Sequence, residues 1–451
     1  MRICSRGDLM GTTVSSEEED ESRRAPEHYD FPQQGVRGGM DLAGSQAWTE
    51  LLKSVENGSA RSISVDSESV PPNLSCADVE TLRSALTRNG SLKSVTIGNV
   101  SSEAMRLLAE AIQGAPSVSE MNFTGPKADD ALAKLLGTLL QPVWLRETSL
   151  RHLIIANERR NLLTDRGGVA IAQALEENRH LQTLVMFGTY MGDGAARAVA
   201  TALELNTSLK VLVFYGKALS SRGVFAFCRW VKAENISLQE LVIGGSDFSD
   251  EDGQVLLQLV SNRLLSEPEL PLRSFGLLNV ELGDASAQAL GDLIQCGISK
   301  VSMLAGKLSD EGAALLARSL GSRTARLASL HLATSAAGRA GLEALGGAWL
   351  GGQATGSSME SMELAFAGAS PSDCQDLMDR AASKSSSGLR SLAASSSCSS
   401  PAGARLIATP DFQGYLEKTL FPRLMLRVNT TKTVVGTTPA AAPRAVENLK
   451  D

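Results

Sequence analysis

Side chains that bind metals or act as nucleophiles are few and scattered along this sequence. The histidines are His28, His152, His180 and His331, and their spacing is not that of zinc ligands. The six cysteines form no CxxC pair and have no histidine cluster beside them, so we expect isolated thiols. A GxxxxGK[ST] phosphate loop, a GxGxxG turn after a strand and a GxSxG nucleophile turn are all absent. The sequence therefore predicts no enzymatic site, no cofactor, no bound metal and no small-molecule substrate.

Charged residues form the second group that could carry a function. Acidic pairs such as Asp310 and Glu311 recur where helices are predicted to start, and there they would complement the helix dipole. An acidic run at 17–21 follows Ser15 and Ser16, which are either targets of an acid-directed kinase or simply part of a solvated tail. The net charge is −7 and no basic stripe is apparent, so neither nucleic acid nor a membrane is expected as a partner. Isolated thiols, together with the lack of an apolar leader, favour a cytoplasmic or nuclear location.

One apolar pattern recurs from about residue 60 to residue 400. Each copy reads apolar-x-x-apolar-x-apolar, which is typical of a short strand with one buried face. Successive copies start 26 to 34 residues apart, a spacing that indicates a repeat solenoid. The clearest copies are Leu150/Leu153/Ile155, Leu181/Leu184/Met186, Leu209/Leu212/Phe214, Leu238/Leu241/Ile243, Leu272/Phe275/Leu277, Ile298/Val301/Met303, Leu327/Leu330/Leu332 and Met359/Met362/Leu364, with weaker ones near Ile63, Leu92, Val118 and Leu389.

A second apolar set follows the strands and has helical spacing. Pairs such as Ile171 and Leu175, or Val199 and Leu203, are i,i+4 partners on one face of a predicted helix. Right-handed crossovers between such strand–helix units make the sheet parallel, and wider helices place the strands on the concave side. We therefore predict an α/β horseshoe solenoid of about 11–12 repeats over residues 47–428, with strands on the concave face and helices on the convex face.

Capping segments and tails complete the predicted organisation. Trp48, Leu51 and Leu52 are suited to cover the first repeat, and the apolar residues of 411–428 are suited to cover the last one. Residues 1–46, which are acidic, and residues 429–451 are polar and lack a sustained period, so both are predicted to be disordered tails.

The segments LTDRGGVAIAQALEENRHLQTL, MGDGAARAVATALELNTSLKVL and LSDEGAALLARSLGSRTARLASL resemble leucine-rich repeats of the ribonuclease-inhibitor class. This class occurs in ribonuclease inhibitor, in the repeat region of NOD-like receptors and in the Ran GTPase-activating protein. The resemblance implies a solenoid that binds another protein. The family usually has Asn or Cys near the end of each strand, where this chain has Thr189, Lys217, Ser246, Val280 and Gly306. We therefore expect a less regular and more mobile inner turn than in the family.

Strand residues that point away from the core define the candidate partner site. In four consecutive units the position after the middle leucine holds a β-branched apolar residue, and the next outward position adds two aromatic residues. A contiguous apolar patch on a concave sheet suggests a binding site for a partner protein. Two alternatives remain open: β-branched residues that serve strand propensity, and a patch covered by a tail of the chain. The candidate residues are Ile154, Val185, Phe187, Val213, Tyr215 and Val242.

A longer loop after one predicted strand supports an alternative function. It contains Asn157, Arg159 and Arg160. The resemblance to the Ran regulator implies that these residues would contact a Ran-type small GTPase and that the array would stimulate hydrolysis by ordering residues of the GTPase. In the animal and fungal members of that family the acidic segment follows the repeats, whereas here it precedes them. A solvated loop without a binding role is the other interpretation.

Overall fold

The computed structural model describes residues 42–66, 74–112, 115–124, 127–141, 150–156, 162–231, 237–245, 249–321, 326–354, 361–384, 398–399 and 404–408. The predicted tail 429–451 and residues 1–41 of the other predicted tail lie outside these ranges. Helix α1 (Leu42–Glu56) begins five residues before the predicted start of the solenoid at residue 47. Trp48 and Val55 anchor this helix in the core, and extending an anchored helix by a few residues costs little.

A single parallel sheet runs through the described part of the chain from Leu42 onward. Strands β1 to β11 follow one another in chain order, and each pairs in parallel with the next. These strands are β1 (Ser62–Val65), β2 (Ser94–Ile97), β3 (Glu120–Phe123), β4 (His152–Ala156), β5 (Thr183–Gly192), β6 (Val211–Ala218), β7 (Glu240–Gly244), β8 (Ser274–Leu278), β9 (Lys300–Gly306), β10 (Ser329–Gly338) and β11 (Ser361–Gly368). The predicted α/β solenoid with a parallel sheet is confirmed.

The sheet ends differently from the predicted pattern. Strand β13 (Ala404–Ala408) pairs in parallel with β11, and β12 (Cys398–Ser399) pairs with β13 in the antiparallel direction. The weak predicted copy near Leu389 lies outside the described residues. The described chain therefore continues beyond β11 with a strand that the repeat pattern did not identify.

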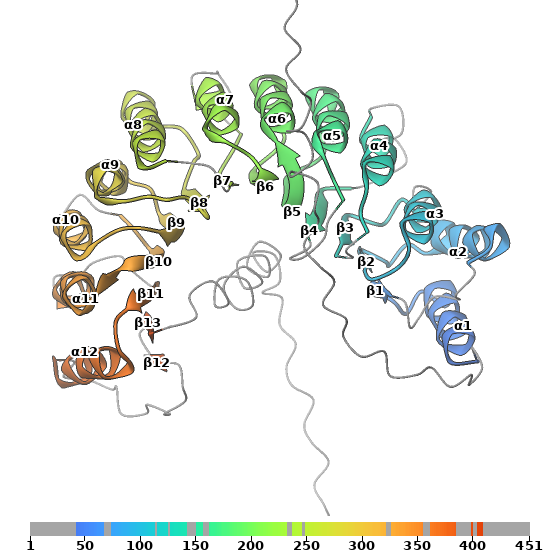
Figure 1. The fold of residues 1–451 in the computed structure, drawn as a ribbon. Coiled ribbons are helices and arrows are strands. Elements are labelled where there is room, and N and C mark those ends of the chain that lie inside the picture. Colours follow the sequence, from blue (N-terminus) through green and yellow to red (C-terminus); the bar gives the residue numbers. More distant parts are fainter. Residues whose placement is uncertain are drawn as a thin grey trace, which may run out of the picture. The chain divides into compact units, whose positions relative to one another are not determined.

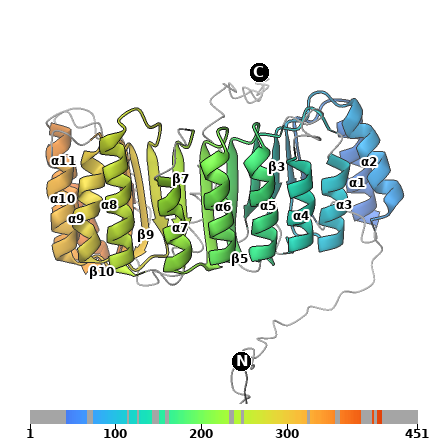
Figure 2. The same cartoon turned by 90° about the horizontal axis from the view of Figure 1, so that it is seen from above.

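A helix follows each of the strands β1 to β11 and lies on the opposite side of the sheet from the inner face (Figure 1). Viewed from above, the helices stand side by side in chain order (Figure 2). Side chains such as Ser249, which accepts a hydrogen bond from the backbone N–H of Asp252, fix where a helix begins. The helices are α2 (Cys76–Arg88), α3 (Ser102–Ile112), α4 (Asp130–Leu139), α5 (Asp165–Glu177), α6 (Asp193–Leu205), α7 (Ser221–Val231), α8 (Asp250–Ser266), α9 (Asp284–Gln295), α10 (Asp310–Leu320), α11 (Arg339–Ala354) and α12 (Pro371–Lys384).

The hydrophobic core lies between the sheet and the helices and follows the two predicted apolar registers. Leu184 and Met186 from β5 are fully buried against Ile171 and Leu175 from α5. Trp48 is buried at the front of this core. Because one repeat cannot cover its own apolar side, each unit depends on its neighbours for this burial.

Aspartates at the helix starts link each repeat to the next one. Asp165, the first residue of α5, accepts hydrogen bonds from the backbone N–H groups of Gly192, Gly194 and Ala195 at the start of α6. Equivalent bonds to the following repeat come from the first residues of five more helices, Asp130, Asp193, Asp250, Asp284 and Asp310. The predicted role of these acids at helix starts was therefore incomplete, because they also satisfy backbone donors of the next unit.

Asparagines at the C-terminal ends of the helices also link neighbouring repeats through hydrogen bonds to backbone groups. The side-chain amide of Asn206, which is fully buried, donates to the carbonyl oxygens of Leu175 and Asn178, and its oxygen accepts from the backbone N–H of Leu209. Asn89 and Asn178 occupy the same position after α2 and α5 and make similar bonds. Thr189, at the position where the resembled family has Asn or Cys, is fully buried and donates its hydroxyl to the carbonyl oxygen of Tyr215 in the next repeat. Polar bonds between repeats are therefore present there as well as at the helix ends.

Candidate functional site

The six candidate residues lie on the inner face of the sheet, opposite the helices. Val185 alternates along β5 with Leu184 and Met186, whose side chains belong to the core. In the register of the sheet, Val185 pairs with Ile154 on β4 and with Val213 on β6. Val213 in turn pairs with Val242 on β7. The structure therefore brings the four β-branched residues into one row across four neighbouring strands.

The two aromatic candidates complete this row. Phe187 and Tyr215 stack with their ring centroids 4.9 Å apart and their planes inclined by 25°. All six candidates belong to one cluster of buried apolar side chains, which is separate from the core between sheet and helices. We call it the inner-face cluster.

The inner-face cluster is closed to solvent, contrary to the expectation of an open concave sheet. Val185 is 0% exposed, Val213 1%, and Tyr215, the most exposed member, 9%. Strand propensity alone does not explain this burial, because neighbours in a sheet shield a side chain laterally and leave its tip uncovered.

The cluster extends further along the sheet than the sequence pattern indicated. Leu278 on β8, Leu304 on β9, Ala333 on β10 and Ala365 on β11 also belong to it, and each is at most 1% exposed. These residues lie two positions beyond the middle inner-face residue of their strand. Inspecting this position in every repeat of the sequence would have identified the four residues, since it holds an apolar residue in each of these four strands.

Polar residues flank the apolar row at both ends. Asn122 on β3 donates from its amide to the carboxylate of Glu120 at 2.8 Å. His331 on β10 and Glu363 on β11 are 4% and 9% exposed. In the described strands, the middle inner-face position is therefore apolar only from β4 to β7, and the apolar cluster continues to β11 through the position two residues further on.

One acid at the edge of the cluster has a shifted pKa. Burial raises the pKa of the Glu240 carboxyl, although the charge of Lys300 and the hydroxyl of Ser274 act in the opposite direction. Glu240 begins β7, directly before the strand residues that lead to Val242. A raised pKa makes this carboxyl easier to neutralise when a partner or another segment covers it.

The residues of the alternative GTPase contact, Asn157, Arg159 and Arg160, lie outside the described residues. The described residues of that unit stop at Ala156 and resume at Leu162.

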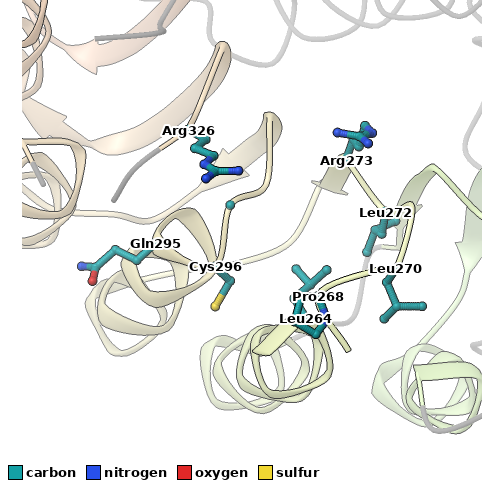
Figure 3. Close-up of a pocket in the computed structure, with 9 residues that line it drawn as sticks. Leu264, Pro268, Leu270, Leu272, Arg273, Gln295, Cys296 and Arg326 are labelled. Atoms are coloured by element: carbon teal, nitrogen blue, oxygen red, sulfur yellow. The ribbon is translucent and has the colours of Figure 1, made fainter. Parts of the chain in front are cut away.

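A cavity of about 600 Å³ lies between two neighbouring repeats, where α8 and α9 end (Figure 3). It is lined by Leu264, Pro268, Leu270, Leu272, Arg273, Gln295, Cys296, Gly297 and Arg326. Burial raises the pKa of the Cys296 thiol, and the nearby charge of Asp292 raises it further. Because the neutral thiol is a weak nucleophile and no lining residue is a carboxylate or an imidazole, this arrangement does not favour nucleophilic chemistry.

Two further searches of the described residues bear on the class of the protein. They contain no group of three or more His, Cys, Asp or Glu side chains that could hold a metal ion. No helix in the same ranges combines the length and the apolar character needed to cross a membrane.

Comparison with known proteins yields no family and two distant likenesses among solved structures. No model of a known protein family matches it, and no curated protein does. Among solved structures, it is similar to the actin-binding site 2 of leiomodin-1, at 14% identity over 49% of this chain and 92% of that one, with a TM-score of 0.22. It is also similar to a chain of the yeast Rad7 and Elc1 complex, at 12% identity over 71% of this chain and 84% of that one, with a TM-score of 0.39. At these identities and TM-scores, the two structures support no statement about the function of this chain.

Proposed function

We propose that this chain is a leucine-rich-repeat protein of the ribonuclease-inhibitor type and acts as a non-enzymatic scaffold that binds a partner protein through the inner face of its sheet. The strand–turn–helix units of about 30 residues support the family assignment. The curved sheet of a solenoid provides an extended surface for a partner.

The inner-face cluster is the observation that carries this proposal. It joins apolar residues from eight neighbouring strands on a face that the core does not use. A solenoid core needs only the helix-facing side of each strand, so apolar side chains on the other side require a separate explanation. A central pair of aromatic rings, Phe187 and Tyr215, surrounded by aliphatic side chains is the composition of a binding hot spot.

Affinity capture with quantitative mass spectrometry tests the proposal. The full chain is compared with a variant carrying Phe187→Ala and Tyr215→Ala, and with Val255→Asp on the outer helix α8 as the control, since Val255 is 42% exposed. We expect the control to retain the same proteins as the unmodified chain and the double variant to lose them by at least about tenfold, as expected when two hot-spot rings are removed. Equal capture by all three chains contradicts the proposal.

Loss of folding must be separated from loss of binding in this experiment. Removing two buried rings lowers stability, so circular dichroism must show that the double variant remains folded at the capture temperature. Val213→Thr provides a second variant, because it keeps the β-branched shape and replaces one methyl group of the cluster by a hydroxyl. Capture that is weakened by Val213→Thr in a folded chain supports inner-face binding, and unchanged capture opposes it.

A further inference from the structure

The inner-face cluster is covered on the side that faces away from the core. Leu278 on β8 is 0% exposed and Val213 on β6 is 1% exposed, although the described helices that follow β1 to β11 lie on the opposite side of the sheet (Figure 1). Lateral neighbours within a sheet cannot remove the tip of a side chain from water. A covering group above the sheet is therefore required to account for this burial, and an apolar group suits these side chains best.

We propose that the inner-face cluster is the docking surface for the chain's own segment 411–428, DFQGYLEKTLFPRLMLRV. This segment, which we call the C-terminal segment, has apolar residues at a spacing of four over its whole length: Phe412, Leu416, Leu420, Leu424 and Val428. Such spacing is typical of an amphipathic helix with one apolar face, and a bend is expected at Pro422.

Other parts of the chain outside the described ranges are poor candidates for the cover. Residues 1–41 are rich in charged and polar residues and contain the acidic run 17–21. Residues 385–397 read SSSGLRSLAASSS, and residues 435–451 contain no aromatic side chain. Among the stretches of more than ten residues outside the described ranges, only the C-terminal segment combines a long apolar face with aromatic residues, so it matches the chemistry of the cluster best.

The length and origin of the segment also match the cluster. The chain leaves the sheet at β13, which lies next to β11, and 43 residues follow Ala408. From β13 to β6 the sheet order has six strand steps, or about 29 Å at about 4.8 Å for each step. A helix of the segment's length spans about 27 Å. The segment can therefore cover the cluster from Ala365 on β11 to Tyr215 on β6.

Docking of this segment has a consequence for partner binding, and only this consequence rests on the proposed function. The segment and a partner protein would compete for the same side chains. Removal of the segment from the sheet would then strengthen partner capture.

Photo-crosslinking of the full chain tests the docking directly. Benzoylphenylalanine is introduced in place of Tyr215 inside the cluster and, as the control, in place of Tyr190, which is on β5 but 47% exposed. We expect the probe at Tyr215 to cross-link to peptides from 411–428 of the same chain, and the probe at Tyr190 not to do so. Isotope-labelled and unlabelled chains are mixed so that a cross-link to a second copy is recognised. A cross-link to a second copy, to another protein or to no part of 411–428 overturns the proposal.

A second experiment removes the contact without shortening the chain. The variant carries Leu416→Asp and Leu420→Asp, and the control carries Thr437→Asp and Thr438→Asp, which add the same charge beyond the segment. We expect faster amide hydrogen exchange in β6 by about tenfold and a rise in the fluorescence of a hydrophobic dye in the first variant only. Exchange and fluorescence equal to those of the control overturn the proposal.

The two proposals fail in different ways. If the cross-link forms but alanine at Phe187 and Tyr215 leaves capture unchanged, the docking stands and inner-face partner binding is wrong. If capture depends on the cluster but the cross-link to 411–428 is absent, partner binding stands and the docking is wrong.

Discussion

Replacing Asp165 by alanine should destabilise the solenoid at the junction between α5 and α6. The carboxylate of Asp165 accepts three backbone N–H bonds from the next repeat, from Gly192 at 2.6 Å and from Gly194 and Ala195 at 3.1 Å each. It is also the first residue of α5, where a negative charge complements the helix dipole. The substitution therefore leaves three donors of the following helix start without their acceptor.

The magnitude follows from these three bonds. A hydrogen bond to a charged group contributes about 1.5–3 kcal/mol, and Asp165 is only partly buried, so water replaces part of what is lost. We expect the free energy of unfolding to fall by about 2–4 kcal/mol. Asp165→Asn, which keeps one acceptor oxygen but not the charge, should lie between alanine and the unmodified chain.

Urea unfolding followed by far-UV circular dichroism measures this loss. Glu177→Ala on the same helix is the control, because Glu177 is exposed and such substitutions change stability by less than about 0.5 kcal/mol. In a repeat array each unit is stabilised by its neighbours, so weakening one junction can also separate the transition into two steps. A change for Asp165→Ala no larger than that for Glu177→Ala would refute the role of the aspartate ladder.

Three further predictions follow from the same junctions. Gly312→Ala on α10 should lower the free energy of unfolding by about 1–3 kcal/mol, because the added Cβ would collide with the Asp284 carboxylate. Alanine normally favours a helix, so a raised melting temperature of this variant contradicts the prediction. Asn206→Ala should lower the free energy of unfolding by about 2–4 kcal/mol in urea, because it leaves two buried carbonyl groups and the following N–H groups unpaired. A loss below about 0.5 kcal/mol is incompatible with this account. Burial by itself would raise the pKa of Asp193, but hydrogen bonds from the Ser220 backbone and hydroxyl and from the Gly223 backbone, together with the charge of Arg197, hold it below its ordinary value. The stability that this carboxylate contributes is present above about pH 3.9 and is lost as the pH falls through its lower folded pKa. Asp193→Asn should therefore reduce the slope of the free energy of unfolding against pH in the acid range, and an unchanged slope contradicts the prediction.

The sequence predicts the strand layer and the helix layer of this fold well, because each is set by the local spacing of apolar residues. The strand residues Leu184 and Met186 and the helix residues Ile171 and Leu175 are buried as their spacing indicates. In a stack of thin repeats, each apolar residue meets its counterpart in the adjacent unit, so a recurring pattern is enough to identify the core.

The aspartate ladder could not be recognised from the same pattern. Asp165 and Asp310 bond to residues 27 to 31 positions further along the chain, and an acidic residue at a helix start looks the same in the sequence whether or not it makes such bonds. The glycine that follows in the next repeat, such as Gly312 after Asp284, is the signal that could have indicated the ladder, because no room remains for a Cβ there.

The candidate site was only partly accessible to sequence reasoning. Alternation along the strands places Val185 and Val213 on the inner face, and the register of the sheet brings them together. Whether that face is open depends on contacts between segments far apart in the chain, which no local pattern encodes. The burial of the cluster therefore came only from the structure.

Hydrogen exchange of the full chain, alone and bound to its most strongly captured partner, tests inner-face binding most directly. We predict that the added protection appears in the inner-face strands from β4 (His152–Ala156) to β8 (Ser274–Leu278) and leaves the outer helices α5 to α8 unchanged. Protection confined to those helices, with unchanged exchange in β5 and β6, would contradict binding through the inner face of the sheet.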